Sequence, residues 1–269
     1  MEYLVKLKNL KVDFLIEDQI IEALKGISFE IFPEEIVALV GESGSGKSVT
    51  CQAILDILPK YARVEGDIIL NIDKYKNKNL KSLTDEQKRD IRGNHISMIF
   101  QEPSAVLNPL FTIGEQIVET ILAHQSISEG EAYKKAIEAM ENAKIPHPEI
   151  RFKQYPHEMS GGLKQRVAIA IAIANYPKLL LADEPTTALD VTVSAQILKL
   201  FKSLKQNLKV GILLVTHDLG IVAEVADRVL VIYKGEIVET GDVFEIFENP
   251  KHPYTKKLLS SRPSIFSEK

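Results

Sequence analysis

The sequence predicts an α/β fold with a mainly parallel sheet, an N-terminal antiparallel β subdomain and an inserted helical subdomain. Three observations predict it. The first 35 residues alternate apolar and polar positions, four later segments are continuous apolar runs, and an internal segment carries its apolar residues at helical spacing. A chain of 269 residues is long enough for one large domain with an inserted or appended piece.

The N-terminal segment has the period-two pattern of strands with one buried and one solvated face. This pattern is typical of antiparallel sheets. The alternating apolar residues are Val5, Leu7, Leu10, Val12, Phe14, Ile27, Phe29 and Ile31. We therefore expect antiparallel strands before residue 35.

The four continuous apolar runs are residues 36–40 (IVALV), 96–100 (ISMIF), 179–182 (LLLA) and 212–215 (ILLV). Strands that are buried on both faces lose the alternation, and such strands occur in parallel sheets covered by helices. Helical segments separate the four runs. The sequence therefore predicts a buried parallel sheet.

The segment 111–153 contains no strand-like run, and we expect a helical insertion at about 105–165. Its apolar residues recur at helical spacing: Ile117, Ile121, Ala132, Ala136, Ile137 and Met140. The lysine-rich residues 74–81 precede a sequence at 84–87 that resembles a capping box, so we expect them to form a solvated loop.

Composition excludes several classes of protein. The net charge of -4 gives no global attraction to nucleic acid or to an anionic bilayer, so we expect no nucleic-acid partner. Cys51 is the single cysteine, which rules out an intrachain disulfide and fits a reducing compartment. We expect no signal peptide, and the longest apolar stretch, residues 167–174, is too short to span a bilayer.

A phosphate-binding loop follows the first apolar run. Residues 41–48 (GESGSGKS) match G-x-x-x-x-G-K-[ST], after residues 36–40 and before the helical segment 49–58. Loop N–H groups and the helix N-terminus attract phosphate, Lys47 is expected to reach the β and γ phosphates, and Ser48 to bind Mg²⁺. The predicted ATP- or GTP-binding residues are Gly41, Ser43, Gly44, Ser45, Gly46, Lys47, Ser48 and Val49.

Polar side chains end three of the other apolar runs. Asp183 and Glu184 follow residues 179–182, His217 follows residues 212–215, and Gln101 follows residues 96–100. Ligands of open α/β sheets bind at the carboxyl ends of strands. We expect Asp183 to hold Mg²⁺ through its water shell, Glu184 to polarise the attacking water, and His217 to contact the γ phosphate.

Residues 159–163 (MSGGL) precede a helical segment at 166–174. Together with the phosphate loop, Gln101, Asp183, Glu184, residues 188–190 (ALD) and His217, they make the chain resemble the ATP-binding cassette (ABC) ATPases over its whole length. The signature of that family is usually L-S-G-G-Q. The resemblance implies an ABC-type P-loop fold and an ATPase that uses ATP and Mg²⁺.

The resemblance also implies that the site needs a second chain. Ser160 and the amides of Gly161 and Gly162 are expected to reach the γ phosphate of ATP bound to an opposite subunit, which is an identical or a paralogous ABC ATPase. The loop of Asp190 is expected to cross to that partner. Leu163 replaces the usual glutamine, which removes a polar group near the nucleotide.

Two further residues take roles from the resemblance. Gln101 lies in the loop that links Mg²⁺ to membrane subunits, so the expected metal site is Ser48, Gln101 and Asp183, and the expected catalytic set is Glu184, His217, Gln101 and Lys47. Phe14 falls where the family places an aromatic ring against adenine. The alternating strand pattern places Phe14 equally well in the core, and both alternatives stay open.

Shorter motifs resemble one branch of the family, the oligopeptide, dipeptide and nickel importers. They are residues 101–103 (QEP), 107–109 (LNP), 155–158 (YPHE) and 249–255 (NPKHPYT). The resemblance implies a nucleotide-binding domain at 1–248 and a peptide-importer tail at 249–269. Many members of the branch carry a cysteine-rich extension for an iron-sulfur cluster, and with Cys51 alone we expect no cluster.

An importer ATPase implies partners that this chain does not contain. They are transmembrane permease subunits and, indirectly, an extracytoplasmic substrate-binding protein, with the ATPase on the cytoplasmic face of the membrane. Nickel or peptide-antibiotic uptake is the alternative to di- or oligopeptide uptake. A nontransport ABC ATPase is disfavoured because no sustained heptads lie between Ser48 and Ser160, and a cassette without turnover because Glu184 and His217 are present.

Overall fold

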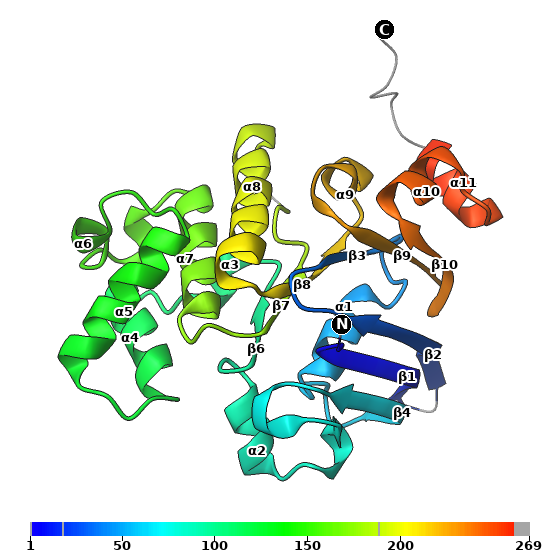
Figure 1. Cartoon of the computed structure of the whole chain (residues 1–269), viewed down its shortest axis with the longest axis horizontal. Coiled ribbons are helices and arrows are strands. Elements are labelled where there is room, and N and C mark those ends of the chain that lie inside the picture. The colour runs from blue at the N-terminus through cyan, green and yellow to red at the C-terminus, as the bar shows by residue number, and fades with distance from the viewer. Residues whose placement is uncertain (1, 18, 188, 261–269) are drawn as a thin grey trace, which may run out of the picture.

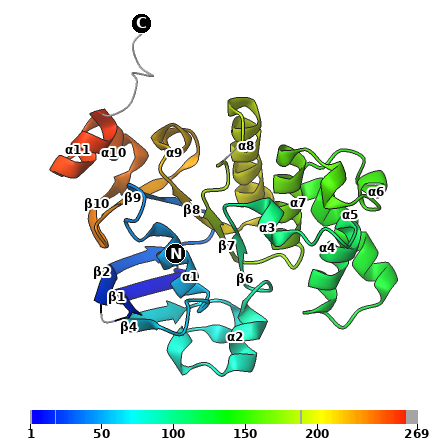
Figure 2. The same cartoon turned by 180° about the vertical axis from the view of Figure 1, so that it is seen from behind.

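The computed structural model describes residues 2–17, 19–187 and 189–260. Two sheets lie next to each other with one helix between them, and a helical group extends at the far end of the molecule (Figure 1). Seen from behind, the same helical group again stands apart from the N-terminal sheet (Figure 2). The expected combination of two sheets and an inserted helical region is confirmed.

The larger sheet has the strand order β10-β9-β3-β8-β7-β6. Its pairs are parallel except for the edge pair β9 and β10, which is antiparallel. The strands are β3 (Ile36–Val40), β6 (Ile96–Ile99), β7 (Leu179–Asp183), β8 (Gly211–Thr216), β9 (Arg228–Tyr233) and β10 (Glu236–Asp242). The four apolar runs are therefore four of its parallel strands, β9 is a fifth, and β10 completes the sheet.

The smaller sheet is antiparallel, as the N-terminal alternation predicts, and has the order β2-β1-β4-β5. Its strands are β1 (Val5–Ile16), β2 (Gln19–Ile31), β4 (Ala62–Leu70) and β5 (Lys78–Asn79). Their inward residues share one apolar cluster with β3 and with α1 (Lys47–Ile54), where Cys51 and Ile54 are fully buried. Helix α1 therefore fixes the phosphate loop between the two sheets.

Strand β3 is covered on both faces, which explains its continuous apolar run. Val37 and Leu39 pack in the cluster of α1 and the small sheet, whereas Ala38 and Val40 pack against α9 and α11. The helices after β7 are α8 (Val191–Leu208), α9 (Leu219–Val225), α10 (Val243–Glu248) and α11 (Pro253–Ser260). None of the helices in the described residues is sufficiently long and apolar to cross a membrane.

The segment 111–153 is helical, as its spacing predicts. It holds α4 (Ile113–Leu122), α5 (Glu129–Asn142) and α6 (Pro148–Arg151), preceded by α3 (Pro103–Val106) and followed by α7 (Gly161–Ile173). Capping boxes at Thr112 and Ser128 start α4 and α5. The insertion limits at about 105 and 165 stay a prediction, as does the division between 1–248 and 249–269, of which residues 261–269 lie outside the described part.

The lysine-rich residues 74–81 differ from the expected solvated loop. They form two short 3₁₀ turns, η1 (Asp73–Tyr75) and η2 (Leu80–Ser82), joined by β5. The reason is burial, because Tyr75 and Leu80 pack into the core of the small sheet while the lysines stay outside. Thr84 then caps α2 (Asp85–Ile91) with the expected capping box.

Two glycines at equivalent positions give a test of the helical packing. Gly114 and Gly130 are the second residues of α4 and α5, but a Cβ at Gly114 would overlap the ring of Phe152, whereas one at Gly130 would meet nothing. We expect Gly114→Ala to lower the free energy of unfolding by about 1–3 kcal/mol, because an overpacked side chain must displace its neighbours.

The matched variant Gly130→Ala is expected to be neutral or to stabilise by up to about 1 kcal/mol, because alanine favours the helix. Urea unfolding of both variants and the wild type measures the difference. Equal stability of the two variants would contradict the packing of α4 against Phe152.

Candidate functional site

Residues 41–48 run from the end of β3 into the first turn of α1, and two of their glycines are required by close packing. A Cβ at Gly41 would overlap the carbonyl oxygen of Ile232. Gly46 has a φ of +105°, and a Cβ there would lie 2.6 Å from Leu24 Cδ2. The loop is therefore held against β9 and β2, with the N-terminus of α1 facing the same space.

Lys47 lies inside the loop, with a relative exposure of 5%. Its Nζ donates to the carbonyl oxygens of Gly41 and Glu42, each at 2.9 Å. Burial lowers the pKa of Lys47, and the nearby carboxylates of Glu184 and Asp183 oppose that shift. The side chain thus presents an ammonium group to the inner face of the loop, where it can bind a phosphate.

Ser48 and Asp183 meet although 135 positions separate them in the chain. The Ser48 hydroxyl donates to Asp183 Oδ1 at 2.9 Å. Asp183 is 6% exposed, and burial raises its pKa, against the effect of the Ser48 hydrogen bond. Two oxygen ligands at this point suit Mg²⁺, which keeps most of its waters.

The described residues contain no group of three or more His, Cys, Asp or Glu side chains that could hold a metal ion. The Ser48 and Asp183 pair instead fits an ion that arrives with its own waters and phosphate ligands.

Glu184 brings three polar side chains together. Its Oε2 accepts from Thr187 Oγ1 at 3.0 Å and from Gln101 Nε2 at 3.4 Å, and its Oε1 lies 3.3 Å from His217 Nδ1. These residues follow β7, β6 and β8, so their meeting is a consequence of the parallel sheet. Sequence reasoning did not identify Thr187, whose only signal was a hydroxyl three positions after Glu184.

The backbone of Glu184 is unusual. Its φ of 45° lies in the left-handed region, which non-glycine residues adopt at a cost. Its N–H donates to the carbonyl oxygen of Val215 at 2.9 Å, which fixes the turn against β8. The carboxylate is thereby aimed along the edge of the sheet.

One cavity of about 850 Å³ joins these groups. The phosphate loop, Gln101, Glu184, Thr187 and His217 line it, and so does Phe14. Phe14 is also partly buried against the small-sheet core, and its ring centroid lies 6.0 Å from that of Tyr61. Phe14 therefore lines the cavity and also packs against the core, so its position is compatible with both alternatives, contact with adenine and a place in the core.

The signature residues 159–163 lie outside the lining of the 850 Å³ cavity. Ser160 caps α7, which begins at Gly161 rather than at the predicted 166, and the Ser160 hydroxyl accepts from the Leu163 N–H at 3.4 Å. Ser160, Gly161 and Gly162 are not among the described residues that line the cavity of the phosphate loop. Gly161 borders a smaller hollow that shares Gln101 and Thr187 with that cavity, and Ser160 and Gly162 border another hollow.

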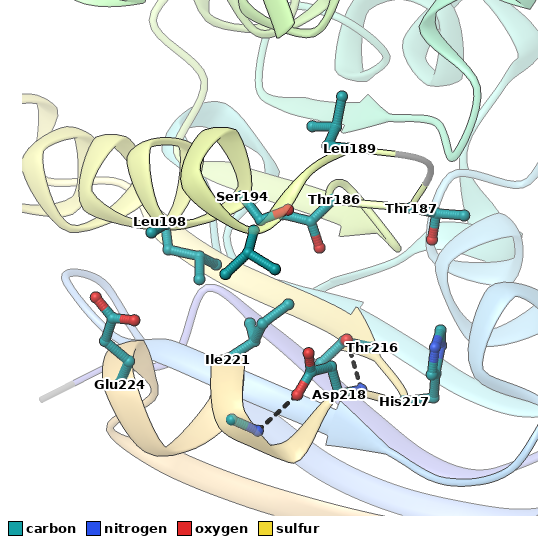
Figure 3. A pocket seen from close by; sticks show the side chains of 13 residues that line it. Thr186, Thr187, Leu189, Ser194, Leu198, Thr216, His217, Asp218, Ile221 and Glu224 are labelled. Atoms are coloured by element: carbon teal, nitrogen blue, oxygen red, sulfur yellow. Dashed lines mark hydrogen bonds between the residues drawn. The ribbon is translucent and has the colours of Figure 1, made fainter. Parts of the chain in front are cut away.

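A second cavity of about 450 Å³ lies between the segment after Glu184, α8 and α9. Figure 3 shows its lining, with Thr186 and Ser194 on one side and Thr216 and Asp218 on the other. Thr216 Oγ1 accepts from the Asp218 N–H at 3.0 Å, which braces the turn that carries His217.

The predicted crossing loop borders this second cavity. Asp190 caps α8 by accepting from the Val193 N–H at 2.9 Å. Leu189, next to it, lines the cavity. Ala188, which belongs to the same motif, lies outside the described residues.

Two family models match the chain. The model described as "ABC transporter" matches residues 24–187, and the model described as "Oligopeptide/dipeptide transporter, C-terminal region" matches residues 238–269. The first covers the phosphate loop, the signature, Asp183 and Glu184. The second covers β10 from residue 238 onward, α10 and α11.

Curated relatives are similar over nearly the whole chain. The dipeptide transport ATP-binding protein DppD of Bacillus subtilis is 48% identical over 98% of this chain and 78% of its own length. The oligopeptide transport ATP-binding protein OppD of the same organism is 48% identical over 98% of this chain and 73% of its own length.

Solved structures agree in fold. A dimeric ATP-binding cassette, MJ0796, in a post-hydrolysis state with ADP and Pi, has a TM-score of 0.77 at 31% identity, over 89% of this chain and 99% of its own. The structure of cbiO1 from Clostridium perfringens, part of an ABC transporter complex, has a TM-score of 0.77 at 28% identity, over 93% and 92% of the two chains.

Proposed function

The chain belongs to the ABC transporter family, and we propose that it is the ATP-hydrolysing subunit of an importer for di- or oligopeptides. One observation carries the proposal. A single cavity joins a phosphate loop to Glu184 and His217, beside the Ser48 and Asp183 pair. This arrangement supports binding of a nucleoside triphosphate and attack of water on its terminal phosphate.

The proposed roles follow from the contacts. Lys47 and the loop N–H groups hold the β and γ phosphates. Ser48 and Asp183 would hold Mg²⁺, which would supply positive charge beside the phosphate oxygens. Glu184 orients the attacking water and accepts its proton. Gln101 and His217 keep the Glu184 carboxylate at the edge of the cavity.

A second ATPase chain, identical or paralogous, completes each site in this proposal. Ser160 and its glycines lie at an exposed helix N-terminus, which attracts anions but does not line the chain's own phosphate cavity. The dimeric state of the similar MJ0796 cassette supports the same arrangement. Each ATP is then held between one chain's loop and the other chain's α7.

Peptides are the proposed cargo because of the relatives and the C-terminal match. Similar proteins are named for dipeptide and oligopeptide transport, and residues 238–269 match a model of oligopeptide and dipeptide transporters. Permease subunits provide the pathway, an extracytoplasmic binding protein delivers the cargo, and this chain sits on the cytoplasmic face of the membrane.

Removal of Mg²⁺ tests the hydrolytic part of the proposal. We expect excess EDTA to reduce ATP turnover by at least about 100-fold, because Mg²⁺ offsets several kcal/mol of developing phosphate charge. Added MgCl₂ is expected to restore turnover fully. Turnover that persists in EDTA at the rate of the untreated protein would contradict the role of Ser48 and Asp183.

Uptake tests the cargo. The transporter is purified from native membranes through a tag on this chain, placed in lipid vesicles with its binding protein, and supplied with ATP on the side of this chain. We expect accumulation of labelled di- or oligopeptide that depends on ATP. Accumulation of nickel, with no peptide uptake, would overturn the peptide assignment and leave the ATPase assignment intact.

A further inference from the structure

The C-terminal helix contacts the phosphate loop directly. Tyr254, the second residue of α11, is 6% exposed, and its hydroxyl accepts a hydrogen bond from the backbone N–H of Glu42 at 3.0 Å. These residues are 212 positions apart in the chain. A segment that follows the whole parallel sheet therefore returns to the start of the nucleotide site.

The hydrogen bond acts on one peptide group of the loop. The carbonyl oxygen of Gly41 and the N–H of Glu42 belong to the same peptide unit, so Lys47 Nζ holds its oxygen at 2.9 Å while Tyr254 holds its N–H. The next carbonyl, that of Glu42, accepts from Lys47 and from the Ser45 N–H at 3.2 Å. The turn that shapes the loop is thus fixed from the inside by Lys47 and from the outside by Tyr254.

The Tyr254 ring is itself held in place. It stacks on Tyr233 with ring centroids 4.1 Å apart and an interplanar angle of 29°, and Tyr233 ends β9, which pairs with β3. Ahead of α11, the Glu239 carboxylate of β10 accepts the N–H groups of Lys251 and His252 at 2.7 and 3.0 Å. The stacking on Tyr233 and the hydrogen bonds to Glu239 therefore fix the position of the Tyr254 hydroxyl next to the loop.

Helix α11 also forms part of the cavity wall. Leu258, one turn after Tyr254, lines the 850 Å³ cavity together with the phosphate loop and Phe14. The helix thus supplies both an anchor for the loop and a side of the space that the nucleotide occupies.

We propose that Tyr254 is a positioning residue that holds the phosphate loop in its binding shape, and that α11 is part of the nucleotide site. The inference rests on the proposed ATPase function. A loop that is already ordered loses less conformational freedom when it binds phosphates, so the anchor raises affinity for nucleotide. It acts on bound substrate and on the transition state alike, which affects binding rather than turnover.

The test is Tyr254→Phe, which keeps the stacked ring and removes only the hydroxyl. We expect the Kd of the full-length chain for MgATP and for MgADP to rise about threefold to tenfold, since one hydrogen bond is lost and the Glu42 N–H is left without it. The turnover at saturating ATP is expected to stay within about twofold. The matched control, Tyr233→Phe, removes a hydroxyl from the other ring of the stack and is expected to keep the wild-type Kd.

Three results would overturn the inference while the ATPase assignment stands: an unchanged Kd in Tyr254→Phe, an equal loss of affinity in both tyrosine variants, or a lower binding stoichiometry at unchanged Kd. The last is the mark of a purely structural role. A wild-type chain that binds neither nucleotide would instead overturn the proposed function, and this inference with it.

Discussion

Glu184→Gln is expected to reduce ATP hydrolysis by about 10²- to 10⁴-fold, because the amide cannot accept the proton of the attacking water. The substitution keeps the size of the side chain, and its remaining oxygen can still accept from Thr187 and Gln101. The phosphate loop and the Ser48 and Asp183 pair are unchanged. Nucleotide affinity is therefore expected to stay close to that of the wild type.

Phosphate release measures turnover, and titration with a fluorescent ATP analogue measures binding. Glu102→Gln is the matched control, since Glu102 is exposed and does not line the 850 Å³ cavity within the described residues. With ATP and Mg²⁺, the Glu184→Gln protein is expected to accumulate as a dimer in size-exclusion chromatography. Turnover equal to that of the wild type would remove Glu184 from its proposed role.

Lys47→Ala is expected to weaken binding of ATP by about 10- to 100-fold, because a hydrogen bond to a charged group contributes about 1.5–3 kcal/mol. The loss extends to loop geometry, since Lys47 also bonds the carbonyl oxygens of Gly41 and Glu42. Hydrolysis is expected to fall further than binding, because charge grows on the phosphate oxygens in the transition state.

Isothermal titration with MgATP measures this loss. Lys202→Ala is a matched control, because Lys202 is exposed on α8 and far in sequence from the loop. An affinity of Lys47→Ala equal to that of Lys202→Ala would show that the loop binds phosphate without its lysine, and would remove Lys47 from its proposed role.

The sequence predicted the parallel sheet because burial on both faces leaves a local trace, the continuous apolar run. It also placed Gln101, Glu184 and His217 after strand-like runs, and polar residues at the carboxyl ends of parallel strands share one edge of the sheet. Strands β9 and β10 were not predicted. Residues 228–233 (RVLVIY) were a detectable apolar run, whereas β10 is half-exposed and shows no clear alternation.

Contacts between residues far apart in the chain could not be predicted from the sequence. The motif at residues 249–255 resembled a branch of the family, but nothing local indicates that its tyrosine bonds the N–H of Glu42. The left-handed backbone of Glu184, whose N–H donates to the carbonyl oxygen of Val215, is likewise not indicated by its residue type. The segment 74–81 was predicted as a solvated loop because of its many lysines. Its structure is instead decided by the burial of Tyr75 and Leu80, which lie between those lysines.

The most direct test of the two-chain ATP site is a structure of the Glu184→Gln transporter, purified from native membranes and trapped with ATP and Mg²⁺. We predict ATP phosphates on residues 41–48, Mg²⁺ beside Ser48 and Asp183, and the signature serine of the second ATPase chain at the γ phosphate. In the second site, Ser160 of this chain is predicted to take that role. A site closed by one chain alone, with Ser160 far from any nucleotide, would contradict the two-chain site.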